Sequence, residues 1–232
     1  MPWGKTTMSI KHHLTEQLLM GYAAGTLPEA FNLVVASHIS MCDDCRAALA
    51  AYEALGGAML EDSCAGAAET DLSPGSFGAC LARLDTVPAD RDASDHQPVP
   101  PAPTGPHTLP EPLRSYVGGD IDAIRWRPVG GGVKQAILPT SRAASARLLF
   151  IPAGSAVPDH GHRGTELTMV LQGAFSDETD HFARGDVEIA DEDLEHMPVA
   201  ETGRDCICLA ATDAPLRFRS WLPRLAQPFL RI

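Results

Sequence analysis

The sequence predicts a multidomain α plus β protein, with a small helical bundle before a proline-rich linker and a β-barrel after it. Residues 86–112 contain eight prolines, residues 1–85 hold stretches with helical periodicity, and residues 113–232 hold short apolar runs between Gly, Pro and Asp. Proline fixes φ and lacks a backbone N–H, so residues 86–112 are predicted to be neither helix nor inner strand. A chain of 232 residues suits two units of about 100–150 residues each.

Three helices are predicted in residues 1–85. The first covers residues 13–24, where apolar residues recur on one face, and Gly25 is placed to end it. The second covers residues 29–55, which contain no Gly or Pro and follow Pro28. The third covers residues 73–85, with Ser73 as its cap and Pro74 in its first position. Three helices of this length enclose a small core, so this domain is expected to need a metal or a partner.

Residues 113–232 are predicted to form a β-sandwich or β-barrel, because short apolar runs recur between turn residues. The predicted strands cover residues 124–129, 133–138, 146–151, 167–171, 187–190, 206–211 and 216–221. Trp126 and Trp221 are expected in the core or at the rim of the barrel.

A cluster of metal ligands is predicted in the helical part. His38, Cys42 and Cys45 have the spacing H-x3-C-x2-C within the predicted second helix, and positions i, i+4 and i+7 share one helix face. Two thiolates and an imidazole suit Zn²⁺, which takes a fourth ligand in a structural site. His13 is the first candidate for that ligand and His12 is its competitor, because an antiparallel helix pair would place the first helix beside His38. The alternative is a C-x-x-C thiol pair with a surface histidine.

A second cluster is predicted in the β part. Residues 154–173 match G-x5-H-x-H-x3-E-x6-G, with His160, His162 and Glu166 as the polar positions. This pattern resembles the first cupin motif. Downstream, Gly185 precedes His196 by eleven residues, as in the second cupin motif, which is otherwise degenerate.

The chemistry of the second cluster follows from the residue types. Residues i and i+2 of a strand share one side, so His160 and His162 can face the barrel interior together. With Glu166 and His196 they supply three imidazoles and one carboxylate, which suit Zn, Fe, Mn or Ni without choosing between them. The alternative is a barrel that keeps these residues for packing and hydrogen bonds.

The two halves together resemble the ChrR-type zinc-binding anti-sigma factors of bacteria over nearly the whole chain, including residues 12–14, 22–27 and 130–133. The resemblance implies two zinc ions per chain. The structural site would use His13, His38, Cys42 and Cys45, and the cupin site would use His160, His162, Glu166 and His196.

The same resemblance implies a function without catalysis. The helical domain would bind an extracytoplasmic-function sigma factor, and the cupin-like domain would release it in response to singlet oxygen or related oxidants. The competing interpretation is a metal-dependent cupin enzyme, of the dioxygenase or isomerase type, with a helical regulatory domain.

The charge balance bears on partners and location. The chain has 18 Lys and Arg against 30 Asp and Glu, a net charge of −12, which argues against direct nucleic-acid binding and favours a basic protein partner. Residues 1–85 hold four Lys and Arg against ten Asp and Glu. No run of about 18 apolar residues and no signal peptide is visible. We therefore expect a cytoplasmic protein without a membrane partner.

The remaining cysteines are less informative. Cys206 and Cys208 form C-x-C within an apolar run, so they would share one side of a strand near the metal as redox candidates. The equally weighted alternative is two buried packing residues. Cys64 and Cys80 are expected to be packing or surface residues, and His181 is expected to face solvent. Oxidation at the cupin site is hypothesised to lower sigma affinity through the linker.

Overall fold

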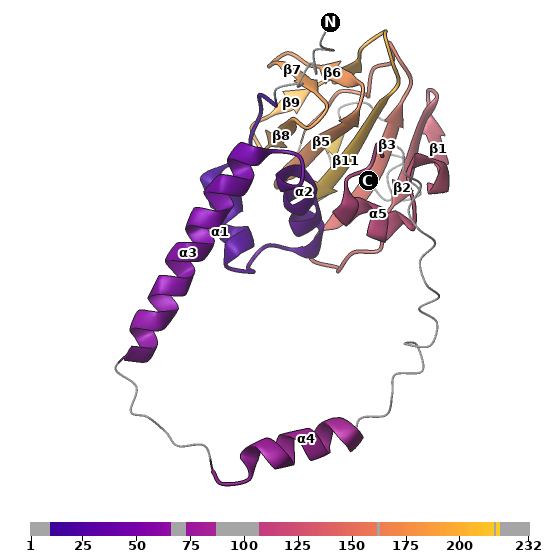
Figure 1. Cartoon of the computed structure of the whole chain (residues 1–232). Coiled ribbons are helices and arrows are strands. Elements are labelled where there is room, and N and C mark those ends of the chain that lie inside the picture. The colour runs from indigo at the N-terminus through magenta and orange to yellow at the C-terminus, as the bar shows by residue number, and fades with distance from the viewer. Residues whose placement is uncertain (1–9, 66–72, 87–106, 162, 216, 219–232) are drawn as a thin grey trace, which may run out of the picture. The chain divides into compact units, whose positions relative to one another are not determined.

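The computed structural model describes residues 10–65, 73–86, 107–161, 163–215 and 217–218 (Figure 1). His162, Trp221 and the central part of the predicted linker, residues 87–106, lie outside these ranges. The chain forms two compact units, one of residues 1–56 with 107–232 and the other of residues 57–106. None of the described helices combines the length and the apolar character needed to cross a bilayer.

Five α-helices and a 3₁₀ turn occupy the described residues: α1 Glu16–Ala23, α2 Glu29–Ile39, α3 Asp43–Ala65, α4 Ser76–Thr86, α5 Glu111–Val117 and η2 Ile121–Ala123. The first helix starts later than predicted because Thr15 is its N-cap and accepts the backbone N–H of Leu18 at 3.3 Å. The start of α4 also differs from the prediction. Pro74 and Gly75 form a turn, and the backbone N–H of Ser76 donates to the Ser73 carbonyl at 3.0 Å.

The prediction of one helix over residues 29–55 is wrong, because residues 40–42 separate α2 from α3. Ser40 ends α2, and its backbone N–H donates to the Ala36 carbonyl. Cys42 precedes α3, and its Sγ accepts the backbone N–H of Cys45 at 3.5 Å as an N-cap side chain would. Asp43 and Asp44 occupy the first turn of α3, where acidic side chains favour a helix start. The helix is therefore divided by residues that cap its two parts, although the segment contains no Gly or Pro.

The C-terminal end of the predicted linker is also corrected. Pro110 is the N-cap of α5 and Pro112 lies in its first turn, where the missing backbone N–H would have no helical partner in any case. Leu109 and Leu113 are buried in the main core. Residues 107–112 therefore belong to the folded unit and not to a linker.

The strands form three antiparallel sheets. The largest has the order β1-β2-β3-β11-β5-β8, and two smaller sheets have the orders β10-β6-β7 and β12-β4-β9. The bounds are β1 Arg127–Gly130, β2 Val133–Ile137, β3 Ser145–Ile151, β4 His160–Gly161, β5 Glu166–Gln172, β6 Ala174–Ser176, β7 His181–Ala183, β8 Val187–Ala190, β9 Glu195–His196, β10 Val199–Ala200, β11 Cys206–Thr212 and β12 Arg217–Phe218. The arrangement is the cupin-like β-barrel that the sequence predicts.

The six-stranded sheet is covered on both faces. On one face, Leu167, Leu209 and Leu148 share a core with Val34 and Leu33 of α2, and α2 lies across β5 and β11 (Figure 1). On the other face, Val170, Cys206 and Cys208 share a second core with Phe175 and Phe182 of the β10-β6-β7 sheet. Strands buried on both faces carry continuous apolar runs, which explains why β5 and β11 were visible in the sequence.

The helices α1 and α2 therefore pack on the barrel instead of standing apart from it. Leu14, Leu19 and Phe31 belong to the same core as the outer face of the sheet. Independent folding of residues 1–85 and of residues 113–232 stays a prediction.

Candidate metal centres

His13, His38, Cys42 and Cys45 come together at the ends of three helical segments, with their ligand atoms all within 4.8 Å of one another. His13 Nδ1 lies 3.3 Å from Cys42 Sγ and 3.6 Å from Cys45 Sγ. His38 Nε2 lies 3.3 Å from Cys45 Sγ. Tetrahedral zinc with ordinary Zn–S and Zn–N bonds would set S–N separations of about 3.5 Å. The four side chains therefore fit a tetrahedral metal ion.

The break between α2 and α3 produces this convergence. His38 lies in the last turn of α2, Cys42 lies in the connection, and Cys45 lies in the first turn of α3. The chain reverses around the cluster, so the three ligands meet from two helix ends and not from one helix face. The predicted residues are thus brought together by a geometry different from the predicted one.

Burial sets the protonation of the ligands. It lowers the pKa of His38 to about 4, so this imidazole is neutral at pH 7 and has a free lone pair. Burial also raises the pKa of the Cys45 thiol to about 11, with a further contribution from Cys42. A metal ion must therefore displace the Cys45 proton when it binds.

His12 does not join the cluster. Its Nε2 lies 3.1 Å from Asp180 Oδ2, and its ring packs against Phe182 with a centroid separation of 4.4 Å. Of the two histidines that the sequence left open, His13 is the one whose ring lies in the cluster.

In the barrel, His160 on β4 and His196 on β9 face each other. The two strands pair with these residues opposite one another, and the two Nε2 atoms are 3.3 Å apart. His160 Nδ1–H donates to the Pro158 carbonyl at 2.9 Å, which makes Nε2 the nitrogen that carries the lone pair. Burial lowers the pKa of His160. Two buried imidazoles thus point their Nε2 atoms at one place.

Two carboxyl groups that the sequence analysis missed hold His196. Its Nδ1 lies 2.9 Å from Glu188 Oε1 on β8 and 3.0 Å from Asp177 Oδ2 after β6. Burial lowers the pKa of His196, but these carboxyl groups outweigh that effect and raise it to about 9. Burial raises the pKa of Glu188 to about 7. The sequence could have pointed to Glu188, because it is a charged residue within an apolar run. Asp177 lies in a turn, where an acidic residue is ordinary, so no sequence pattern pointed to it.

The alternation of β5 and β8 directs the remaining polar side chains inward. Glu166 and Thr168 share one side of β5, and Thr168 Oγ1 donates to Glu166 Oε1 at 3.1 Å. Thr168 is paired with Glu188 across the sheet. The charge of Glu166 acts on both His160 and His196. The described part of the predicted cupin set therefore contains two imidazoles in contact and a buried carboxylate whose charge acts on both. Among the described barrel residues, Asp177, Glu188 and His196 have ligand atoms within 4.8 Å of one another, so they also could hold a metal ion.

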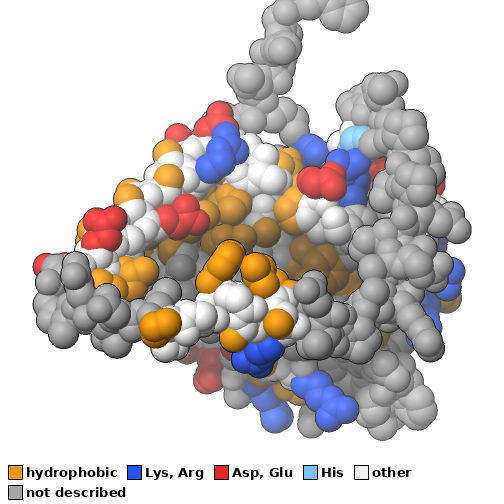
Figure 2. All heavy atoms as spheres, turned by 60° about the horizontal axis from the view of Figure 1, so that its bottom comes forward, with side chains coloured by type: hydrophobic (Ala, Val, Ile, Leu, Met, Phe, Trp, Pro, Cys, Tyr) orange, Lys and Arg blue, Asp and Glu red, His pale blue; other side chains and the backbone are white. Residues whose placement is uncertain are grey.

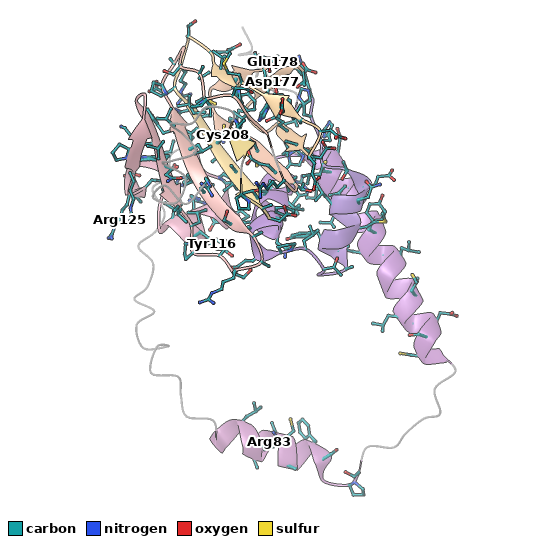
Figure 3. The ribbon with its side chains drawn as sticks, turned by 180° about the vertical axis from the view of Figure 1, so that it is seen from behind. Arg83, Tyr116, Arg125, Asp177, Glu178 and Cys208 are labelled. Atoms are coloured by element: carbon teal, nitrogen blue, oxygen red, sulfur yellow. The ribbon has the colours of Figure 1, made fainter. Side chains whose placement is uncertain are left out.

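The redox candidates lie next to this group. Cys206 and Cys208 are buried on one side of β11 with their Sγ atoms 3.5 Å apart. Figure 3 labels Cys208 within the barrel. The hydrogen bond with Cys206, burial, and the charges of Glu188 and Glu166 raise the pKa of the Cys208 thiol. Cys64 and Cys80 are exposed, and His181 is partly exposed with its Nε2 2.8 Å from Glu201 Oε1.

Comparison with known proteins places this arrangement in a family. Residues 115–215 match the family model described as the ChrR cupin-like domain. The chain is 57% identical to anti-sigma-E factor ChrR of Cereibacter sphaeroides over 225 residues, which cover 97% of this chain and 100% of that protein. A crystal structure of Rhodobacter sphaeroides SigE in complex with the anti-sigma ChrR matches with 55% identity and a TM-score of 0.70, covering 88% of this chain and 100% of that one. The chain therefore belongs to the ChrR family of anti-sigma factors.

Proposed function

We propose that this protein sequesters an extracytoplasmic-function sigma factor in the cytoplasm through residues 1–85 and releases it under singlet-oxygen-type oxidative stress sensed in the barrel. The observation that carries the proposal is an exposed apolar face on a short helix of the unit formed by residues 57–106. The identity with a chain crystallised in complex with SigE supports the same class of partner.

That face belongs to α4. Phe77, Leu81 and Leu84 are 76%, 45% and 64% exposed, and their i, i+4, i+7 spacing places them on one side of the helix. Figure 2 shows hydrophobic side chains gathered on this helix. Such a stripe is a surface that a helical or grooved protein partner would cover.

Apolar side chains are also exposed on α3. Leu55, Met59 and Leu60 are all exposed. The ten acidic against four basic residues of positions 1–85 would complement a protein with basic surfaces for DNA and polymerase, and complementary charge speeds encounter. The exposed apolar side chains of α3 and α4 would supply the affinity of the complex, and the acidic residues would raise the association rate and orient the partner.

Zinc is the metal that we propose for both centres, two ions per chain. Two thiolates and two imidazoles form the donor set of a closed, structural zinc site, and such a site adds folding energy to a small helical region. In the barrel, His160, Glu166 and His196, together with His162, would hold the second ion. There the metal would hold its ligands in place, and these ligands would be the target of the oxidant.

Cys206 and Cys208 stay candidates for the oxidant response. Burial and a raised pKa disfavour the thiolate of Cys208, and oxidation of cysteine follows thiolate character and access. We therefore propose that the metal ligands are modified first and that the cysteine pair responds to the resulting change in packing. Replacement of both cysteines by Ser, with Ala as the apolar control, tests this order. An unchanged response to oxidant in both variants would remove the pair from the mechanism.

The test of the whole proposal uses the full chain, because α1 and α2 share a core with the barrel. The chain is co-expressed with each extracytoplasmic-function sigma factor of its source bacterium and purified by size exclusion. We expect a stable complex with one of them, two zinc ions per chain, and inhibition of transcription that a photosensitiser and light relieve. A chain that binds none of these sigma factors, or that turns over a small substrate with iron or manganese bound, would contradict the proposal.

The sensing role is tested separately by His160→Ala. This variant should still capture the sigma factor, since His160 lies in the barrel and not on α3 or α4, and it should lose the response to light and photosensitiser. A normal response in this variant would separate the barrel metal from sensing.

A further inference from the structure

The turn between β7 and β8, residues 184–186, contacts the helical metal cluster directly. His38 Nδ1–H donates to the Gly185 carbonyl at 2.9 Å, in a buried hydrogen bond that joins residues 147 positions apart. Because Nδ1 carries this proton, Nε2 is left as the metal-binding atom, and it is the atom that lies 3.3 Å from Cys45 Sγ. A backbone carbonyl of the barrel thus fixes the tautomer and the ring orientation of a ligand on α2.

The same turn also binds the two residues that precede His13, the other histidine of the cluster. Asp186 Oδ1 accepts the backbone N–H of Lys11 at 2.6 Å and that of His12 at 2.9 Å. The backbone N–H of Val187 donates to the His12 carbonyl at 3.2 Å. His13, the next residue, supplies Nδ1 to the cluster. Asp186 therefore fixes the position from which His13 reaches the two sulfur atoms.

Gly185 and Asp186 of this turn are buried and closely packed. Asp186 is 2% exposed, and its Oδ2 accepts the backbone N–H of Ala183 at 2.8 Å. Gly185 has φ of 95°, and a Cβ at this position would lie 2.7 Å from Cδ1 and Cγ1 of Ile10. The turn is also bonded to β5, since the Gly185 N–H donates to the Val170 carbonyl at 2.8 Å and the Val170 N–H donates to the Asp186 carbonyl at 3.0 Å. Neither residue can be changed without moving the segment before His13 or the carbonyl that faces His38.

The strand that follows the turn reaches the barrel cluster. Glu188 lies two residues after Asp186 on β8, and its Oε1 is 2.9 Å from Nδ1 of His196. The three residues from Asp186 to Glu188 thus contact the environment of both candidate centres.

We propose that the β7–β8 turn is the positioning element of the helical metal cluster, with the Gly185 carbonyl orienting His38 and the Asp186 carboxylate positioning His13, so that the barrel governs how firmly the helical cluster holds its metal. This inference rests on the metal cluster of the proposed function but not on sigma binding. It gives a direct route from the barrel to the helices in addition to the linker.

The test measures metal retention at the cysteine-containing cluster alone. The full chain is loaded with Co²⁺, because a thiolate-to-cobalt charge-transfer band arises only where cysteine binds the ion, and EDTA is added to follow loss of the band. Asp186→Asn removes the charge and one acceptor while keeping the shape. The matched control is Asp193→Asn, the same change at an exposed position after β8. Cys45→Ala verifies that the band comes from this cluster.

We expect Asp186→Asn to lose Co²⁺ about 10- to 100-fold faster than the unmodified chain, as is typical when a partner of a metal ligand is removed, while Asp193→Asn keeps the original rate. Circular dichroism confirms that the barrel is folded. If Asp186→Asn does not fold, Gly185→Ala replaces it with the same expected result. Equal rates in the folded turn variant and the unmodified chain would overturn the inference. Absence of the band in the unmodified chain would instead refute the metal cluster on which it rests.

Discussion

Phe77→Ala is expected to weaken sigma capture strongly while leaving the fold intact. Phe77 is 76% exposed on α4, so truncation removes little packing within the chain. Substitutions at surface positions without structural contacts change the free energy of unfolding by about 0.5 kcal/mol or less. The same ring is the largest side chain of the apolar stripe formed with Leu81 and Leu84. Its loss should therefore appear in binding and not in stability.

The magnitude follows from the exposed area. An aromatic side chain buries about 200 Å² when it is fully covered, so a ring that is 76% exposed can bury about 150 Å² more. At about 25 cal/mol per Å² this is an upper limit of about 4 kcal/mol. Ordering the side chain at an interface costs about 1 kcal/mol, and incomplete coverage lowers the gain further. A loss of about 2–3 kcal/mol corresponds to about 30- to 150-fold weaker binding.

The assay is a titration of the labelled sigma factor with the full chain, followed by fluorescence anisotropy. Ala79→Gln is the matched control, because position 79 lies about 200° around the helix from position 77 and Gln is a good helix former. This control should bind within about threefold of the unmodified chain. If Phe77→Ala binds as tightly as Ala79→Gln, the α4 stripe is not the docking surface. The argument from exposed apolar area would then fail.

Two further predictions concern the metal and pH. Cys45→Ala should purify with one zinc equivalent fewer than the unmodified chain and should melt at a lower temperature, because the remaining ligands cannot close a tetrahedral site; metal analysis and calorimetry check this, and an unchanged zinc content would rule out the cluster. Asp120 accepts backbone N–H groups from Thr108, Leu109 and Ile121; burial raises its pKa, but these bonds outweigh burial and lower it. Its stabilisation is therefore present above the unfolded-state pKa and is lost as the pH falls through the lower folded-state value. Asp120→Asn should cost about 1 kcal/mol in the free energy of unfolding at pH 7, and denaturant titrations should show the difference shrinking below about pH 4; a difference independent of pH would contradict the assignment.

The sequence predicted those parts of the fold that depend on local pattern. The strands 167–171 and 206–211 were visible because both of their faces are buried, which makes them continuously apolar. The sequence also singled out the four side chains His13, His38, Cys42 and Cys45 that converge in the structure, because ligand chemistry restricts residue type and spacing. The motif at residues 154–173 was specific enough to indicate the barrel and its family.

The features that could not be predicted from the sequence depend on tertiary geometry. The break at residues 40–42 comes from Ser40 and the Sγ of Cys42, which act as caps only because the chain folds back there. Pro110 and Pro112 were assigned to the linker because the eight prolines of residues 86–112 suggested an extended chain. The first turn of a helix also accepts proline. Asp186 is an acidic residue in a turn, which is usually solvated. Its role depends on residues 11 and 12 lying beside it, a contact across 174 positions.

Under the proposed function, the packing of α2 would connect a small change in the barrel to sigma binding. Val34 and Val35 are fully buried, so α2 cannot shift freely on the sheet, and His38 at its end is held by the Gly185 carbonyl. A neutral hydrogen bond contributes about 1 kcal/mol and one to a charged group about 1.5–3 kcal/mol. A tenfold fall in affinity needs about 1.4 kcal/mol of coupling. If the hydrogen bonds that the β7–β8 turn makes to His38, Lys11 and His12 are coupled to partner binding as we propose, their loss supplies enough free energy for a tenfold fall in affinity.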